Sequence, residues 1–347
     1  MLEEFGRDLS ALAAVGALEP LIGRAEEVRR MIDILSMQGK NNPIIVGPPG
    51  VGKTCIVEGF AQVLNVGSVP EPLKGKKIFQ LDFTAIVSGT IYRGQLEERI
   101  QRLIDELLEH REYIVFIDEF HTIALPTLNR SFDFANVLKP YLAKGEITII
   151  GATTEEEFKK YVEEGDPALA RRFVKVRVGE PPKNELKQIL QRTSKRMGSR
   201  YGMVIPEVTI DRLIDLSDQY IKDRYFPDKA IDLLKEALAE KRFNMSADGM
   251  RGDLQVLENI LDTEIKAVET GDLPGVEKAL AAWDEKKNMI FLRTLTPDDI
   301  ATMLAKRTGA VIGDNQLVET HKRIQDLDKA FGVSIIGQKR AKDAVLG

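Results

Sequence analysis

Several residue types that would favour particular functions are scarce in this sequence. It holds a single cysteine, Cys55, so an internal disulfide and a cysteine-based zinc cluster are both excluded. Its three histidines, His110, His121 and His321, are too scattered to form a metal-ligand pattern. A chain without disulfides fits a reducing, cytosolic compartment best, so we expect a cytoplasmic protein.

Long apolar runs and an excess of one charge are also missing. No apolar stretch approaches the roughly 20 residues that a membrane-spanning helix needs, and the first residues are acidic where a signal peptide would be basic. The 49 basic and 54 acidic residues give a net charge of -5, and no block of Lys or Arg creates a strongly basic face. We therefore expect neither a membrane protein nor a protein that binds nucleic acid duplexes.

What remains is an ordinary globular composition. Hydrophobic residues make up 43% of the chain and charged residues 30%, so wholesale disorder, collagen-like repeats and coiled-coil rods are excluded as descriptions of the whole chain. At roughly 100 to 200 residues per domain, 347 residues predict two or three domains.

Apolar periodicity predicts alternating strands and helices as far as residue 180. Short apolar runs predict strands at residues 41–47, 77–83, 113–117 and 148–150. Helical spacing of apolar residues predicts helices at 24–38, from the turn at 52 through 64, at 96–109 and at 132–143. Strands that alternate with helices indicate a parallel sheet covered on both faces, so the expected fold class is α/β.

From residue 181 onward only helices are predicted. Their ranges are 184–197, 208–221, 228–243, a hairpin formed by 251–268 and 276–283, and a last helix that Thr296 caps and that runs through Thr308. Residues 335–338 echo residues 21–24, so we expect a second module to begin there and to be cut off. The predicted domains are a linker (1–20), a large α/β subdomain (21–180), a helical small subdomain (181–245), an inserted hairpin (246–290), and a return to the small subdomain followed by a linker and the start of the truncated second module (291–347).

A phosphate-binding loop is the strongest local signal. Residues 47–54, GPPGVGKT, match the pattern G-x-x-x-x-G-K-T and lie between a predicted strand and a predicted helix, as the motif requires. In such loops the backbone N–H groups surround the phosphates, the lysine neutralises their charge and the threonine hydroxyl binds Mg²⁺. The predicted contacts to ATP are Pro49, Gly50, Val51, Gly52, Lys53, Thr54 and Cys55.

Two further strands end in residues suited to nucleotide hydrolysis. Asp118 and Glu119 follow four apolar residues, and we expect Asp118 to hold Mg²⁺ through water and Glu119 to activate the attacking water as a general base. Thr154 is our choice for a residue that senses the γ-phosphate, with Thr153 close behind. An N-cap for the helix that begins at Glu155 is an equally weighted alternative for Thr153.

Taken together, these residues resemble the first AAA+ module of the Clp-type (heat-shock 100 class) ring ATPases, which unfold and disaggregate proteins. The following passages carry the match over essentially the whole chain: LEEFGRDLSALAAVGALEPLIGR, KNNPIIVGPPGVGKTCIVEGFAQ, YRGQLEER, IVFIDEFHTI, IIGATTEEEF, PALARRFVKV and FPDKAIDLL. The resemblance implies a parallel five-stranded sheet, a helical small domain, a short helical-hairpin middle domain, and a homo-hexamer that hydrolyses ATP with Mg²⁺ and threads polypeptides.

The resemblance also implies roles for matching residues. Arg171 and Arg172 stand where the family carries arginine fingers that reach the neighbouring subunit's γ-phosphate. Ile22 and Gly23 match the segment that packs against adenine, and Lys229 stands near the sensor position of the small domain. The passage Tyr92, Arg93 and Gly94 matches the pore loop whose aromatic ring grips a threaded polypeptide.

Some residues depart from the family pattern. Pro48 replaces a usual Glu, Ile91 replaces a basic or polar residue before the tyrosine, and residues 124–133 replace the Gly-rich second pore loop, whose function is therefore not transferred. The short hairpin favours a family member with a short middle domain, and an adaptor or peptidase partner remains open. Two other functions stay as alternatives: a nucleic-acid motor or clamp loader, and a ring scaffold that binds nucleotide without hydrolysing it.

Overall fold

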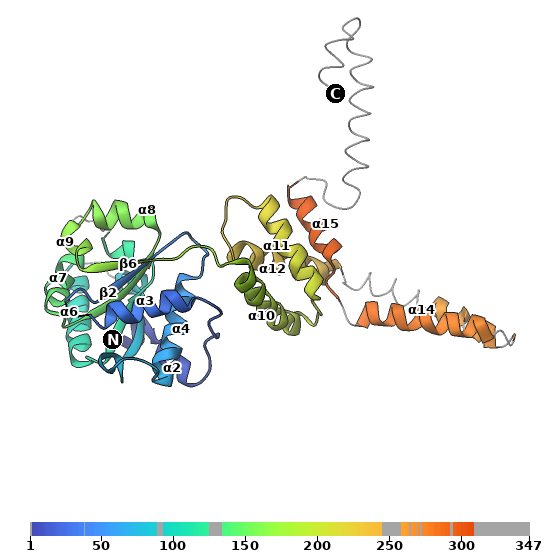
Figure 1. The fold of residues 1–347 in the computed structure, drawn as a ribbon, viewed down its shortest axis with the longest axis horizontal. Coiled ribbons are helices and arrows are strands. Elements are labelled where there is room, and N and C mark those ends of the chain that lie inside the picture. Colours follow the sequence, from blue (N-terminus) through green and yellow to red (C-terminus); the bar gives the residue numbers. More distant parts are fainter. Residues whose placement is uncertain are drawn as a thin grey trace, which may run out of the picture. The chain divides into compact units, whose positions relative to one another are not determined.

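The computed structural model describes residues 2–37, 39–88, 93–124, 134–244, 258–263, 265–268, 270, 273–291 and 294–308. These residues belong to two compact units (Figure 1). The first unit comprises Met1–Leu186 and Asp223–Asp228, and the second comprises Lys187–Lys222 and Lys229–Gly347. Tyr92, residues 125–133 and the echo at 335–338 lie outside the described residues.

The first unit is built on a six-stranded sheet with the order β1-β3-β4-β5-β2-β6. Five strands are parallel: β2 (Asn42–Val46), β3 (Lys77–Leu81), β4 (Tyr113–Ile117), β5 (Thr148–Thr153) and β6 (Phe173–Arg177). The predicted α/β class and the five parallel strands are confirmed. The strand count needs a correction, because β1 (Gly6–Asp8) adds a sixth strand that pairs antiparallel with β3.

The residues that form β1 come from the predicted N-terminal linker. Helix α1 (Leu2–Phe5), β1 and helix α2 (Leu9–Ala14) follow one another, and the side chains of Leu2, Phe5 and Leu9 are buried. The Ser10 hydroxyl also accepts a hydrogen bond from the Ile78 N–H on β3 at 2.9 Å. Residues 2–14 therefore belong to the sheet unit rather than to a linker, because their apolar side chains find burial against it.

Both faces of the sheet are covered by helices. Alternate residues of β2 divide between two apolar clusters: Ile44 and Val46 belong to one, and Ile45 belongs to the other. The first cluster includes helices α6 (Arg93–Glu109) and α7 (Phe134–Lys144), and the second includes α2, α3 (Ala25–Leu35) and α4 (Lys53–Val66), as Figure 1 shows. The short elements are α5 (Phe83–Val87), η1 (Glu71–Leu73), η2 (Phe120–Ala124), α8 (Glu155–Glu157), η3 (Phe158–Glu163) and α9 (Pro167–Ala170).

The rest of the described chain is helical, as predicted. Its helices include α10 (Lys183–Tyr201), α11 (Glu207–Tyr220), α12 (Asp228–Asn244), α14 (Leu273–Phe291) and α15 (Pro297–Thr308), and residues 258–263 and 265–268 are also helical. Thr296 caps α15 as expected: its hydroxyl accepts from the Asp299 N–H, and the Asp299 carboxylate accepts from the Thr296 N–H at 2.8 Å. Helix α15 packs on α11, and both belong to the second unit. Among the described helices, none is both long and apolar enough to cross a membrane.

Candidate functional site

The phosphate-loop motif lies between β2 and α4, where the sequence placed it. Gly50 and Gly52 have left-handed backbone conformations, with φ of 79° and 92°, and Gly52 is the N-cap of α4. A β-carbon at Gly50 would lie 2.6 Å from the Asp228 β-carbon, so a side chain has no room there. The loop thus turns into the start of a 14-residue helix, where backbone N–H groups and the helix dipole favour an anion.

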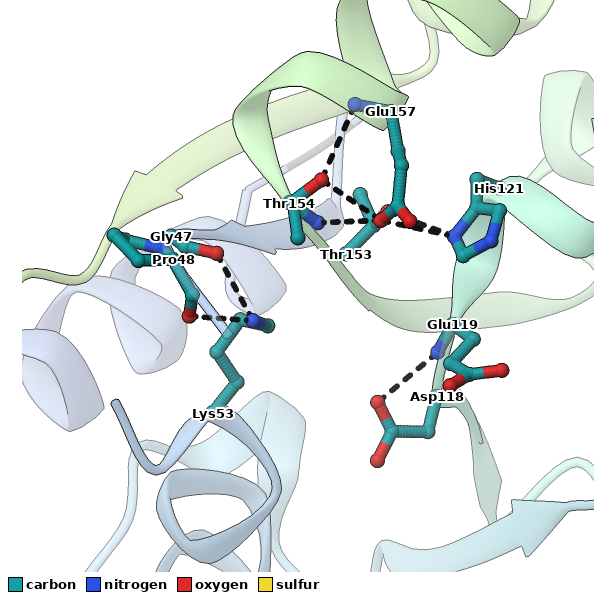
Figure 2. Close-up of polar contacts among 9 residues, drawn as sticks. All are labelled: Gly47, Pro48, Lys53, Asp118, Glu119, His121, Thr153, Thr154 and Glu157. Carbon is teal, nitrogen blue, oxygen red and sulfur yellow. Dashed lines mark hydrogen bonds and ion pairs between the residues drawn. The ribbon is translucent and has the colours of Figure 1, made fainter. Parts of the chain in front are cut away.

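Lys53 points back into this loop. Its ammonium donates to the Gly47 and Pro48 carbonyls, both at 2.9 Å (Figure 2). Burial lowers the pKa of Lys53, although the carboxylates of Asp118 and Glu157 oppose that shift. A partly desolvated cation held at the loop is suited to neutralising phosphate oxygens, which carry the opposite charge.

A residue that was not predicted as part of the site also stabilises the loop. The Arg24 guanidinium is buried and donates through Nη2 to the Val51 carbonyl at 3.1 Å and to the Gly179 carbonyl at 2.8 Å. Its Nη1 donates to Glu27 at 2.9 Å. A charged residue directly after Gly23, at the start of a predicted helix, was the available signal.

The two residues predicted to pack against adenine precede Arg24. Ile22 is half-buried and Gly23 is exposed, with a φ of 67°. The left-handed φ favours glycine at this position, and a β-carbon there would lie 2.0 Å from the Glu185 carboxylate, which would have to shift. Cys55, predicted as the last contact of the phosphate loop, has an exposed side chain in the first turn of α4.

The carboxylates at the end of β4 lie beside the loop. The Thr54 hydroxyl donates to Asp118 Oδ2 at 2.6 Å, and Asp118 Oδ1 accepts from the Glu119 N–H at 3.0 Å. Glu119 has a left-handed backbone with φ of 50°, which is uncommon outside glycine, and its side chain is exposed. A cavity of about 480 Å³ is lined by both of these residues and also by residues 4–7 and 80–85. The N-terminal segment therefore also shapes this site.

The polar residues at the end of β5 form a hydrogen-bonded network (Figure 2). Thr154 is the N-cap of α8 and makes a capping box with Glu157, whose N–H donates to the Thr154 hydroxyl at 3.2 Å. Thr153 is buried, donates to Glu157 at 3.0 Å, and lies 3.1 Å from His121 Nδ1. The cap is thus Thr154, whereas the sequence had left Thr153 as the capping alternative. His121, which follows Glu119 by two residues, was not predicted as part of the site.

The arginine pair lies away from these groups. Arg171 and Arg172 are exposed, and no ion pair to another described residue involves either guanidinium. They directly precede β6, where Phe173 pairs with Asn42 at the start of β2. Since the phosphate loop follows the other end of β2, about 16 Å of strand separates the arginine pair from that end of the sheet.

The remaining predicted residues belong to other parts of the chain. Lys229 belongs to the second unit, is buried, and donates to the Ile221 carbonyl at 3.1 Å. Gly94 is exposed in the first turn of α6, while Tyr92 and the side chain of Arg93 lie outside the described residues. Within the described chain, no cluster of three or more His, Cys, Asp or Glu side chains could hold a metal by itself.

The sequence of this chain matches two models of known protein families. Residues 43–179 match the model of the ATPase family associated with various cellular activities (AAA), and residues 183–272 match an AAA lid domain. The chain carries an AAA ATPase module. The first match begins in β2 and ends after β6, so it covers the phosphate loop, Asp118 and the arginine pair within one AAA domain.

The relatives of this AAA module are Clp proteins. It is 37% identical to the negative regulator of genetic competence ClpC/MecB of Bacillus subtilis and 36% identical to the chaperone protein ClpB of Oceanobacillus iheyensis, in each case over 99% of this chain and 44% of the relative. A Saccharomyces cerevisiae Hsp104:casein complex is 28% identical with a TM-score of 0.73, over 99% of this chain and 52% of that one. The resemblance to the Clp and heat-shock 100 class is confirmed, and the chain spans about half the length of these relatives.

The network around Glu157 makes a prediction about stability. Burial alone would raise the pKa of Glu157, but hydrogen bonds from Thr154 and Thr153 and the charge of His121 hold the pKa below its ordinary value. A lowered folded-state pKa contributes stability above the unfolded-state pKa, about 4.3, and that contribution is lost as the pH falls through the folded-state pKa. The free energy of unfolding lost in Glu157→Gln should therefore be greatest near neutral pH and shrink below about pH 4.

This prediction is checked by urea unfolding, followed by circular dichroism, between about pH 3 and pH 7. The neighbouring Glu156→Gln is the matched control, because the Glu156 side chain is exposed and should show little difference at any pH. A loss in Glu157→Gln that stays constant with pH would contradict the role given to its charge.

Proposed function

We propose that this chain hydrolyses ATP at the phosphate loop and that hydrolysis drives the unfolding and threading of polypeptides by a hexameric ring. The observation that carries the proposal is the 2.6 Å contact between Thr54 and Asp118, with Lys53 beside it and Glu119 next in the chain. It unites the four groups that such hydrolysis needs from one subunit: a phosphate cradle, a cation, a metal-binding pair and a base.

The residues at this contact fit Mg²⁺. A threonine hydroxyl and a carboxylate are hard oxygen donors of the kind that Mg²⁺ takes alongside phosphate oxygens and water. Thr54 would bind the ion directly and Asp118 would hold it through water. When bound, Mg²⁺ would neutralise charge on the transferred phosphoryl group.

Glu119 and the end of β5 complete the proposed reaction site within one subunit. Glu119 is the candidate base because its exposed carboxylate has no hydrogen-bond partner among the described residues and can orient a water, while Asp118 is engaged by Thr54 and by the Glu119 N–H. Both threonine hydroxyls at the end of β5 are engaged, that of Thr154 in the α8 cap and that of Thr153 with Glu157 and His121. We therefore give Thr153 and Thr154 equal weight as the residue that senses the γ-phosphate.

The arginine pair is proposed to act between subunits. Arg171 and Arg172 lie at the end of the sheet opposite their own phosphate loop, so a γ-phosphate that they reach must belong to another copy of the chain. Such arginines stabilise the charge of the phosphoryl-transfer transition state. This arrangement requires an oligomer and supports the expected hexamer. Ile22, Gly23 and Lys229 are kept as proposed nucleotide contacts.

Polypeptide is the proposed substrate because of the relatives. A solved Hsp104 structure contains casein, and ClpB is named as a chaperone. On this basis Tyr92, Arg93 and Gly94 are proposed to grip a threaded chain. Neither a nucleic-acid motor nor a passive scaffold is favoured by a specific feature of the described residues.

Two substitutions should separate nucleotide binding from turnover. Lys53→Ala removes the cation at the loop and should abolish ATP binding, whereas Glu119→Gln should keep binding and slow hydrolysis by about a hundredfold to ten-thousandfold. Binding is measured with a fluorescent ATP analogue and turnover by phosphate release. Tight ATP binding by Lys53→Ala, or an unchanged rate in Glu119→Gln, would remove that residue from the proposed mechanism.

Subunit mixing should show whether the arginines act on a neighbour. Rings of Arg171→Ala/Arg172→Ala should lose about 10³ to 10⁵ in rate, and rings of Glu119→Gln should also be inactive. Mixing the two should restore hydrolysis, because some interfaces then combine an intact base with intact arginines. If rings shown by native mass spectrometry to be mixed stay inactive, the arginines do not act across the interface.

Threading should depend on Tyr92 in the intact protein. Tyr92→Ala should leave basal ATP hydrolysis largely unchanged but remove its stimulation by unfolded casein and the unfolding of a tagged substrate. Tyr92→Phe is the matched control and should keep most of the activity, because gripping needs the ring face more than the hydroxyl. Any second ATPase module is inactivated first. Unfolding at the parental rate by Tyr92→Ala would contradict the threading proposal, and stimulation of ATP hydrolysis by single-stranded DNA would favour a nucleic-acid motor.

A further inference from the structure

The strand that leads into the phosphate loop begins with a buried polar side chain. Asn42 is the first residue of β2 and is fully buried. Its Oδ1 accepts from the Ile149 N–H on β5 at 2.7 Å, and its Nδ2 donates to the Arg172 carbonyl at 3.3 Å. One amide side chain thus ties together three adjacent strands at the end of the sheet remote from the loop, and one of its partners is the main chain of the arginine pair.

The main chain of Arg172 is held on both sides. Its N–H donates to the Leu169 carbonyl of α9 at 2.9 Å, and its carbonyl accepts from Asn42. Helix α9 is in turn capped by Asp166, which accepts from the Leu169 N–H at 3.1 Å and pairs with Lys139 at 2.5 Å. The arginine side chains are exposed, so their direction depends on this main-chain support rather than on side-chain partners among the described residues.

We propose that Asn42 is a positioning residue for the arginine pair: it fixes the Arg172 carbonyl so that Arg171 and Arg172 present their guanidinium groups to a second copy of this chain. The inference rests on the proposed action of the arginines between subunits and extends it to a residue that touches neither nucleotide nor substrate. Displacing a reacting group by about 1 Å can cost about 10² in rate. Substitution of Asn42 should therefore lower hydrolysis by up to about a hundredfold, less than loss of both arginines.

The informative variant is Asn42→Asp. The carboxylate has the size of the amide and still accepts from Ile149, but it places an acceptor against the Arg172 carbonyl, where a donor is needed. Asn42→Ala, which removes both bonds, is the second variant in case the buried charge prevents folding. Asn41→Ala is the matched control, because this neighbouring amide donates to the Thr148 hydroxyl at 3.4 Å and makes no hydrogen bond to Arg172 among the described residues.

The test is the behaviour of Asn42 variants in mixed rings of the intact protein. A subunit that merely presents its arginines badly should still bind the fluorescent ATP analogue with unchanged affinity and still hydrolyse ATP when a neighbour supplies good arginines. Mixing Asn42→Asp with Glu119→Gln should therefore restore hydrolysis, whereas mixing Asn42→Asp with Arg171→Ala/Arg172→Ala should not. Asn41→Ala should keep the parental rate in unmixed rings.

The opposite pattern would overturn the inference. If Asn42 acted only through β2 and the phosphate loop, both variants would lose nucleotide affinity and would fail to recover with Glu119→Gln. An Asn41→Ala defect as large as that of Asn42→Asp would also overturn it, because the effect would then belong to the strand end in general. The mixture of Glu119→Gln with Arg171→Ala/Arg172→Ala distinguishes failure of the proposed function from failure of the positioning role. If that mixture does not recover hydrolysis, the proposed action of the arginines between subunits is wrong. If it recovers hydrolysis while mixtures of Glu119→Gln with Asn42 variants do not, only the positioning role of Asn42 is wrong.

Discussion

The parallel pairing of β2 with β5 on one side and β6 on the other is the constraint on which the site depends. All five residues of β2 are buried, so this strand can neither slip nor leave the sheet without exposing apolar side chains on both faces. Because β4 and β5 run in the same direction as β2, Asp118 and Thr153 end at the same edge as the phosphate loop. Strand direction alone thus brings these residues to one end of the sheet.

Hydrogen bonds then refine what strand direction begins. Arg24 donates a hydrogen bond to the Val51 carbonyl, and Lys53 donates hydrogen bonds to the Gly47 and Pro48 carbonyls. Two side chains therefore stabilise the loop at different points. A buried guanidinium is costly to desolvate unless its donors are used, and Arg24 uses them on two carbonyls and on Glu27. The same bonds link the loop to Gly179, where the chain leaves the sheet, so loop geometry and the start of the connecting segment are physically joined.

Most of the fold and much of the site could be predicted from the sequence because both rest on local patterns. Buried parallel strands appear in the sequence as apolar runs, and a phosphate loop appears as a glycine-rich motif. What escaped prediction depends on contacts far apart in the chain: β1 is three residues long and takes its place only by pairing with β3, and His121 gains a role only beside Thr153. The position of the helix cap at Thr154 rather than Thr153 has the same origin, since β5 runs through Thr153, three residues further than its apolar core.

The direction of β6 bears on how many copies of the chain the proposed reaction needs. In a parallel sheet, residues that precede a strand and residues that follow the neighbouring strands lie at opposite ends of the sheet. Arg171 and Arg172 precede β6, whereas their own phosphate loop follows β2, so the length of β2 separates them. No rotamer change closes a gap of about 16 Å, because an arginine side chain is only about half that long, whereas a second copy can bring this edge to the loop without distorting either sheet. If the proposed function holds, strand order is therefore the reason that hydrolysis depends on assembly. Asn42, which joins β2 to the Arg172 carbonyl, lies at the end of the sheet where one subunit would meet the nucleotide of the next.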